Sequence, residues 1–405
     1  MSLLIISDVI PGDFNVGGII LGDIVSGFPD IKFAVFAVCG KPNPESSQPS
    51  NAKVFTRPFS NETSRRHWRG WAGTIGSILQ WMGKFRFELH HLVDEVVTFA
   101  EQEQVNAILV TLSTPSLIAL GPRVAQVLNV PLYSLVWDDP DYILRNHCWD
   151  RFSRNRMLSS FYSALSHSRR VAVVSDSMIE EYKNFGAREC IILRHGFPRS
   201  LIHRPTGPIK NNSSITIGFA GTNYALSSWN SFLKALDILD WKIGGLDIVV
   251  RLLGGQVRLF FQHPARVECL GWHSNDEVLK LLSECDLNYL PYPFDPSLSR
   301  LALLSFPTKL STYVATGRPV FVHAPEYSSL RNFYNEYNLG AFCSSQDPGV
   351  IAFELEQLVK NPDQMRKATL EAIRAADEEL NKDVFLDRFK SLLGEVMPMR
   401  AVCDP

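Results

Sequence analysis

The sequence has almost no excess charge, no long apolar run and no paired cysteines, and each lack excludes a class of protein. Its 40 Lys and Arg against 42 Asp and Glu leave a net charge of −2, which is a poor footprint for binding nucleic acid. The sequence contains no stretch of about 18 consecutive apolar residues, which is the length needed to span a bilayer. The seven cysteines form no C-x-x-C pair, so we expect the reduced thiols of a cytoplasmic protein.

Other familiar signals are also missing. The opening residues, 1–8, carry no basic region before their apolar run, so we expect a buried strand there and no signal peptide. Neither a short-period repeat nor a low-complexity tract occurs. What remains is a chain of 405 residues, 45% hydrophobic and 20% charged, a composition typical of a globular protein with two or three domains.

Short apolar runs alternate with segments of helical period, which is typical of α/β units built on parallel sheets. The pattern predicts two series of strands on either side of a Pro- and Gly-containing linker at 198–214. The final segment, 347–396, is almost entirely helical in pattern. The predicted strands are 3–7, 33–38, 107–111, 132–136 and 171–175 before the linker, and 215–220, 247–253, 267–270, 287–290 and 320–323 after it.

Three turns at predicted strand ends or helix starts could bind a ligand, since ligands of open parallel sheets lie beyond the carboxyl ends of strands. They are 15–18 with Gly17 and Gly18, 218–222, and 305–309. Neither glycine turn is a G-x-G-x-x-G or a P-loop, so a dinucleotide or NTPase site has little support. For any single turn, a tight connection between strand and helix is the simpler explanation.

The order of these pieces resembles the GT-B glycosyltransferases, specifically the large retaining family 4, also called glycosyl transferases group 1. The resemblance covers about 215–359, with a fainter match in the first half. Each piece alone is weakly specific, but their order and spacing together are fairly specific. The matching runs are 217–221, 267–272, 274–278, 284–291 and 306–320, and in the first half 16–18, 173–177 and 192–196.

The resemblance implies a GT-B fold, in which two Rossmann-like domains face one another across a cleft. The N-terminal acceptor domain would be 1–197 and the C-terminal donor domain 215–382, with a helix at 383–400 packing back on the first domain. The implied activity is transfer of a sugar from a nucleotide diphosphate sugar to the hydroxyl of a saccharide, lipid-linked or small-molecule acceptor, with retention and without a cofactor or metal.

The sequence departs from the family pattern in two places. Leu304 and Thr312 stand where members usually carry two Glu residues, and 225–230 lacks an Arg and Lys that many members have. A branch of the family has a Pro-x-Lys-Leu helix start, which Pro307-Thr308-Lys309-Leu310 resembles. The alternatives are a nucleotide-sugar 2-epimerase, an inverting GT-B transferase, and a noncatalytic partner subunit that kept the fold.

The donor site predicted for the second domain rests on cations, because a departing nucleotide diphosphate needs positive charge where its own charge develops. Lys309 is the predicted catalytic residue and Arg300 a second cation, although an exposed surface position explains either side chain as well or better. Trp272 and His273 are candidates for contact with the base, and packing explains the Trp equally well. The other predicted donor-binding residues are Gly221, Thr222, Ser305, Pro307, Thr308 and Thr312.

The acceptor site predicted for the first domain combines Gly17 and Gly18 with carboxylates that follow a strand. Asp138 or Asp139 would bind a hydroxyl, or act as base in an inverting enzyme. A turn and helix cap beside Pro140 is the competing explanation. Asp139-x-Asp141 matches a metal-binding D-x-D, but no His or further acid follows at ligand spacing, so we expect no metal.

One segment, 65–87, interleaves cations with aromatic residues. Such a segment suits peripheral contact with the inner face of a membrane, because Trp lies at headgroup level and Arg attracts anionic lipid. The alternatives are an amphipathic element packed on its own domain, and nucleic acid, for which the patch is small.

Overall fold

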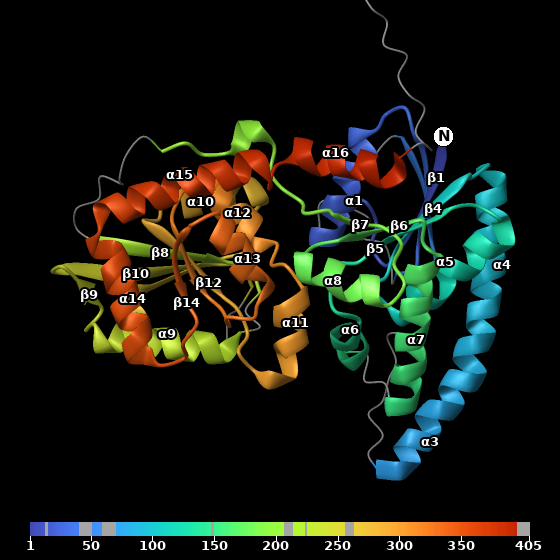
Figure 1. Ribbon diagram of the computed structural model, residues 1–405, viewed down its shortest axis with the longest axis horizontal. Coiled ribbons are helices and arrows are strands. Elements are labelled where there is room, and N and C mark those ends of the chain that lie inside the picture. Colours follow the sequence, from blue (N-terminus) through green and yellow to red (C-terminus); the bar gives the residue numbers. More distant parts are fainter. Residues whose placement is uncertain are drawn as a thin grey trace, which may run out of the picture. The chain divides into compact units, whose positions relative to one another are not determined.

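The structure is a computed structural model that describes residues 1–12, 15–39, 51–58, 70–146, 150–205, 214–222, 225–255 and 263–394. The chain divides into two compact units, of which unit 1 is Met1–Leu193 with Leu386–Pro405 and unit 2 is Arg194–Phe385. Each unit has a twisted, mainly parallel sheet with helices packed on its faces (Figure 1).

The sheet of unit 1 is parallel throughout its described strands, in the order β3-β2-β1-β4-β5-β6-β7. This is the Rossmann order with one strand added. The central strands are continuous apolar runs because helices cover both faces. The strands are β1 (Ser2–Ser7), β2 (Lys32–Ala37), β3 (Ala52–Thr56), β4 (Ala107–Thr111), β5 (Leu132–Leu135), β6 (Arg170–Val173) and β7 (Cys190–Ile192).

The helices of unit 1 begin mostly at polar caps. The side chains of Asn15, Thr114, Asp150 and Ser175 each accept a hydrogen bond from a backbone N–H in the first turn of the helix that follows, which satisfies donors that have no partner within the helix. These helices are α1 (Val16–Gly27), α3 (Gly70–Gln80), the π-helical η1 (Trp81–Phe85), α4 (Arg86–Gln102), α5 (Pro115–Leu128), α6 (Pro140–Asn146), α7 (Arg151–His167) and α8 (Asp176–Asn184).

The sheet of unit 2 has the strand order β11-β10-β8-β12-β13-β14 and is parallel, with the short β9 antiparallel to β10. Stacked and edge-on rings of Trp229, Phe232 and Tyr289 lie in its core. The strands are β8 (Ser214–Ala220), β9 (Lys242–Ile243), β10 (Leu246–Leu253), β11 (Val267–Gly271), β12 (Leu287–Pro291), β13 (Val320–His323) and β14 (Gly340–Cys343).

The helices of unit 2 include a capping box at α10 (Asn275–Ser283), where the side chains of Ser274 and Glu277 each accept from the other's backbone N–H. The final helix, α16 (Lys382–Leu393), starts in unit 2 and ends in unit 1. The other helices are η2 (Arg199–Leu201), α9 (Leu226–Ile238), η3 (Pro264–Arg266), α10 (Asn275–Ser283), η4 (Pro296–Leu298), α11 (Ser299–Leu304), α12 (Lys309–Ala315), α13 (Ser329–Glu336), α14 (Pro348–Lys360) and α15 (Pro362–Glu378).

The last residues of α16 complete the core of unit 1. Phe389 and Leu393 are fully buried, and the ring of Phe389 lies 5.4 Å from that of Phe28. The Tyr133 hydroxyl donates to the carbonyl of Leu393 at 3.1 Å, and the Arg170 guanidinium donates to that of Ser391 at 2.9 Å. The last turns of α16 therefore share one core with residues from the first half of the sequence.

A buried histidine at the end of β13 makes the stability of unit 2 depend on pH. The Nε2 of His323 donates to the carbonyl of Ser345 at 2.8 Å, and its Nδ1 lies 2.9 Å from the Tyr289 hydroxyl. Burial lowers the pKa of His323 from 6.5 to about 4. The unfolded chain binds a proton at this histidine at a higher pH than the folded chain does. The contribution of the neutral histidine to the stability is therefore complete above pH 6.5 and is lost as the pH falls toward 4.

We expect the free energy of unfolding, measured with urea, to fall by about 2 kcal/mol more in the parent than in His323→Gln between pH 7.5 and pH 5. The variant is the control because it removes this titration and leaves every other group in place. An equal pH dependence in both proteins would show that His323 does not titrate as its burial requires.

No helix in the described ranges is long and apolar enough to cross a membrane. Of the predicted aromatic and cationic segment, 65–69 lies outside the residues that the structure describes. The five described cysteines are free thiols.

Candidate functional site

The carboxyl ends of three neighbouring strands in unit 2 present glycine backbone. Gly221 follows β8, Gly254 follows β10 and Gly271 ends β11, and all three have positive φ, of 95°, 119° and 78°. The N–H of Gly221 donates to the carbonyl of Leu253 at 2.9 Å, and that of Gly254 donates to Gly271 at 2.7 Å. A Cβ on Gly254 would lie 3.1 Å from the nitrogen of Gly221. The three turns can therefore approach this closely only because Gly254 has no side chain.

Lys309, the first residue of α12, reaches this glycine edge. Its Nζ donates to the carbonyl of Thr222 at 2.6 Å and lies 5.4 Å from the centre of the Phe219 ring. A Cβ on Gly221 would lie 2.9 Å from the lysine Cε, so the glycine makes room for the lysine stem. Burial lowers the pKa of Lys309 to about 8. The structure thus brings together Gly221, Thr222 and Lys309, which the sequence assigned to one site.

The turn before α12 is held by hydrogen bonds to the carbonyl group of Ser305. The carbonyl of Ser305 accepts a hydrogen bond from the Tyr292 hydroxyl at 2.7 Å and another from the Ser329 hydroxyl. The Tyr313 hydroxyl accepts from the N–H of Ala220 at 3.0 Å, which ties α12 to the end of β8. The Ser305 Oγ is buried and makes no hydrogen bond to the described residues. It is therefore a polar group that a ligand could satisfy.

The remaining predicted donor residues lie around the same strand ends. Pro307 is buried, Thr308 is exposed, and Thr312 and Arg300 are half-buried in α12 and α11. Leu304, which the resemblance aligns with a Glu of the family, is completely buried and so serves the core.

Trp272 and His273 follow β11, the outermost strand of the glycine edge. Trp272 is 80% exposed, so it is not a packing residue within the described part of the chain. A ring nitrogen of His273 lies 3.1 Å from the carbonyl of Leu270, and the other lies 3.7 Å from the Glu277 carboxylate. A flat, accessible indole therefore stands beside a histidine whose orientation is fixed.

In unit 1, the structure brings Gly17 together with the motif that follows β5. A Cβ on Gly17 would lie 3.1 Å from the Trp137 ring, so the turn after β1 packs directly against the residue before Asp138. Gly18 has a different role. It is buried, its N–H donates to the Asn15 side chain at 2.7 Å, and a Cβ there would lie 2.8 Å from the carbonyl of Ile10. The size of Gly18 is thus required by its own loop.

The carboxylates of the Asp139-x-Asp141 motif have structural partners. Asp139 is buried, and its Oδ2 accepts from the N–H of Tyr142 at 3.0 Å, which caps α6. Asp141 pairs with Arg145 at 2.6 Å and with Arg154 at 3.5 Å. Within the described residues, no group of three His, Cys, Asp or Glu side chains could hold a metal ion. Asp138 is half-buried, so it is the more accessible of the two predicted carboxylates.

Sequence reasoning missed a further carboxylate at the same edge. Asp8 directly follows β1, and its Oδ1 accepts a hydrogen bond from the Ser113 hydroxyl, after β4, at 2.6 Å. Burial and then the nearby Asp8 carboxylate raise the pKa of the Cys39 thiol. The signal was present, because an acid immediately after a buried strand of a parallel sheet lies where ligands bind.

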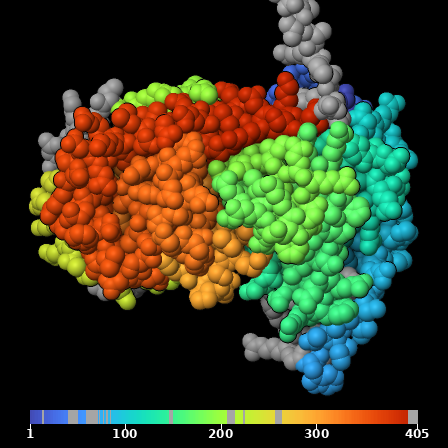
Figure 2. Space-filling view, in the orientation of Figure 1, coloured from blue at the N-terminus to red at the C-terminus, as the bar shows by residue number. Residues whose placement is uncertain are grey.

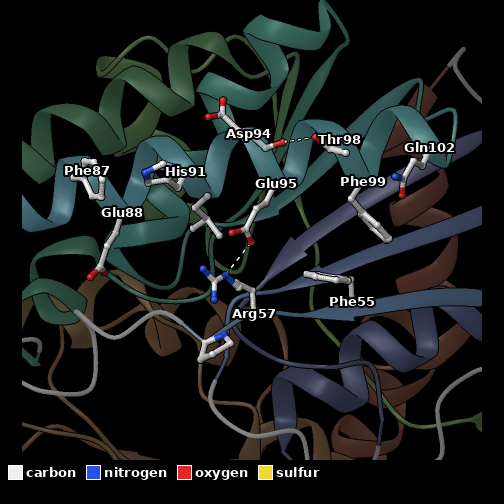
Figure 3. A pocket seen from close by; sticks show the side chains of 12 residues that line it. Phe55, Arg57, Phe87, Glu88, His91, Asp94, Glu95, Thr98, Phe99 and Gln102 are labelled. Atoms are coloured by element: carbon white, nitrogen blue, oxygen red, sulfur yellow. Dashed lines mark hydrogen bonds and ion pairs between the residues drawn. The ribbon is translucent and has the colours of Figure 1, made fainter.

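A cavity of about 1010 Å³ lies elsewhere in unit 1, between β3 and α4. Figure 3 shows Phe55 and Phe99 facing one another on one side and the ion pair between Arg57 and Glu95, 2.9 Å long, across its middle. None of the predicted site residues lines it. The predicted site residues lie at or near the strand ends of the two units, so we take those edges, and not the cavity, as the candidate sites.

Two Rossmann-like units in one chain define the GT-B fold, and solved structures confirm it. Sucrose-phosphate synthase from Thermosynechococcus elongatus matches with a TM-score of 0.68 and 11% identity over 98% of both chains. HepE of Anabaena in complex with UDP matches with a TM-score of 0.66 and 14% identity, over 97% of this chain and 99% of that chain.

A third match was solved with a sugar phosphate. An α,α-trehalose-phosphate synthase (UDP-forming) from Burkholderia xenovorans, in complex with glucose-6-phosphate, matches with a TM-score of 0.63 and 9% identity. The match covers 96% of this chain and 99% of that chain. No family model and no curated protein matches the sequence. Because the identities are this low, membership in retaining family 4 stays a prediction.

Proposed function

We propose that this protein transfers a sugar from a nucleotide diphosphate sugar to an acceptor hydroxyl, with retention of configuration. The observation that carries the proposal is the cation of Lys309 lying across Gly221 at a strand edge made of glycine backbone. A diphosphate needs this combination, because its charge requires a cation and a glycine edge lets its oxygens come close to the backbone.

The donor diphosphate would lie between Gly221–Thr222 and the turn 305–309. As the bond from the anomeric carbon to the phosphate oxygen breaks, negative charge develops on the diphosphate, and the Lys309 ammonium stabilises it. The Ser305 hydroxyl, buried without a protein partner among the described residues, would donate to the same group. Trp272 and His273 would then lie beside the base, and UDP is the first nucleotide to test, because HepE was solved with UDP.

Retention would need no protein base. Asp139, one of the two bases predicted for an inverting enzyme, is committed to capping α6, which leaves Asp138 for that alternative. In the retaining reaction, the departing phosphate can take the proton of the acceptor hydroxyl, so the protein has only to position the groups. A trehalose-6-phosphate synthase among the structural neighbours is described as working by glycosyl transfer with retention.

The acceptor would bind at the strand ends of unit 1. Gly17 packs against the Trp137 ring, which places the first turn of α1 beside the residue before Asp138. The carboxylates of Asp138 and Asp8 can accept hydrogen bonds from sugar hydroxyls. A saccharide is therefore the acceptor class that these side chains suit best, whether it is free or carried by a lipid.

The test is a thermal-shift screen against UDP, GDP and ADP, followed by turnover of the corresponding labelled nucleotide sugars. A nucleotide at 100 times its dissociation constant adds about 2.7 kcal/mol of stability, which the screen detects. Turnover with retention supports the proposal. Binding without turnover would indicate a noncatalytic partner subunit, and the absence of any nucleotide binding would overturn the assignment of the site.

We expect activity to be unchanged in EDTA, because Lys309 takes the role that a metal has in D-x-D transferases. The measurement is the initial rate with and without chelator. A loss of activity in EDTA that manganese restores would contradict this and would indicate a metal site at Asp139 and Asp141.

A further inference from the structure

Helix α3, η1 and the first turn of α4 in unit 1 carry a row of large apolar side chains that face solvent. Trp71, Ile75, Leu79 and Met82 follow one another at spacings of four, four and three residues, which place them along one side of a helix. Their exposed fractions are 79% for Trp71, 49% for Ile75, 64% for Leu79, 51% for Met82 and 68% for Phe87. We call these five residues the apolar face.

Charge is absent from this face and positive at its border. Residues 70–83 contain no charged side chain, although an exposed helix normally carries charge on its solvent side. Arg86 is exposed where η1 meets α4. Helix α3 also contacts α7, which begins with the exposed Arg151 and Phe152. Figures 1 and 2 show the start of α7 beside α3 at the end of unit 1 farthest from the label of the N-terminus.

The sign of the charge changes immediately beyond the face. Glu88, Asp94 and Glu95 follow on α4 and line the cavity between α4 and β3. Phe87 belongs to both surfaces. An anionic surface in contact with the apolar face would thus meet cations at its border, and α4 carboxylates would limit the contact to the segment before Glu88.

We infer that the apolar face docks on an anionic lipid bilayer, with its side chains in the interfacial region and Arg86 and Arg151 among the headgroups. Trp is the residue type favoured at headgroup depth, and an uncharged helix stripe of this length can enter the acyl boundary without burying a charge. A second copy of the chain fits less well. In a two-fold dimer the same patch meets itself, which would bring the bordering arginines together. The inference does not rest on glycosyl transfer, because binding is measured without substrate.

The experiment is cosedimentation of the full chain with vesicles of phosphatidylcholine, with and without about 30% phosphatidylglycerol. We expect binding to the anionic vesicles that weakens in about 0.5 M NaCl. The double variant Leu79→Ser/Phe87→Ser should bind about ten- to a hundred-fold more weakly.

The matched control is Leu370→Ser/Phe353→Ser. Leu370 and Phe353 are 61% and 58% exposed, so the control removes the same two side-chain types at similar exposure, but from unit 2. It should bind as the parent does. Trp71→Ser changes the most exposed residue of the face and tests the inference independently if the double variant does not fold.

Three results would overturn the inference. The first is that the parent does not sediment with anionic vesicles. The second is that the control loses as much binding as the double variant and Trp71→Ser do. The third is a concentration-dependent dimer in light scattering without lipid that Trp71→Ser abolishes, which would assign the face to a second copy of the chain.

Discussion

Lys309→Ala is expected to lower kcat for sugar transfer by about ten- to a thousand-fold, because it removes the cation that meets the charge developing on the diphosphate. The parent ammonium lies 2.6 Å from the Thr222 carbonyl and over the Phe219 ring, so it is held in place before the donor binds. The measurement is initial-rate kinetics with a labelled nucleotide sugar, with the folded state of the variant checked by its thermal transition.

Lys309→Met separates charge from packing, since it keeps a long apolar stem beside Gly221 and removes only the ammonium. It should lose as much activity as the alanine variant. Lys280→Met, on the exposed side of α10, should be unchanged. The pKa of about 8 adds a second readout: kcat/KM should fall as the pH rises above 8, while the corresponding fall in kcat should come at higher pH because a bound diphosphate favours the ammonium. Parent-like kinetics in a folded Lys309→Met protein would remove Lys309 from the site.

Gly254→Ala is expected to weaken nucleotide binding by about ten- to a hundred-fold. The φ of Gly254 is 119°, a backbone conformation that is strained for any residue with a side chain. The Cβ of an alanine there would lie 3.1 Å from the nitrogen and 3.2 Å from the carbonyl oxygen of Gly221. The turn after β8 must then move, and the diphosphate would lose the backbone on which it rests. Calorimetric titration with the nucleotide found in the thermal-shift screen measures the effect.

Gly245→Ala is the control for backbone strain. Gly245 also has a positive φ, of 85°, but it precedes β10 at the opposite end of the strand, and a Cβ there meets nothing within 4 Å. It should cost stability without changing the affinity. If both variants bind nucleotide as the parent does, the glycine edge is not the donor site.

The two-sheet architecture could be predicted because parallel strands are covered on both faces, and so read as continuous apolar runs. The runs at 3–7, 107–111 and 287–290 correspond closely to β1, β4 and β12. Within the segment 347–396, which the pattern predicted to be helical, Asn361 caps α15 ahead of Pro362. In these places local sequence and tertiary burial agree.

The strands that were missed lie near the edges or are very short. In β3, residues alternate between half-buried and exposed, so its apolar content is diluted. β7 has only three residues, and β14 begins at Gly340 with a φ of 144°. Such strands form because a neighbouring strand offers hydrogen bonds, and a single-sequence pattern contains no record of that neighbour.

The site was only partly legible for a related reason. The sequence singled out Lys309 and Gly221 as members of one site, and the structure shows them in contact. Gly254 was overlooked because its importance comes from the turn that packs against it. Asp139 was identified, but its hydrogen bond to Tyr142 forms only once α6 does, so the sequence pattern could not show that partner. In both cases the chain acquires the partner by folding.

The route of the chain through the two units sets the order in which they can mature on the ribosome. Unit 2 is one continuous stretch, Arg194–Phe385, and all of its residues are synthesised before the end of α16. Unit 1 is discontinuous, and its core lacks Phe389 and Leu393 until the last residues have emerged. The domain that is translated first is therefore completed last. A chain that stops at Phe385 lacks the ring that packs against Phe28 and the carbonyl that accepts from Tyr133, and chaperones bind incompletely covered apolar surface of this kind.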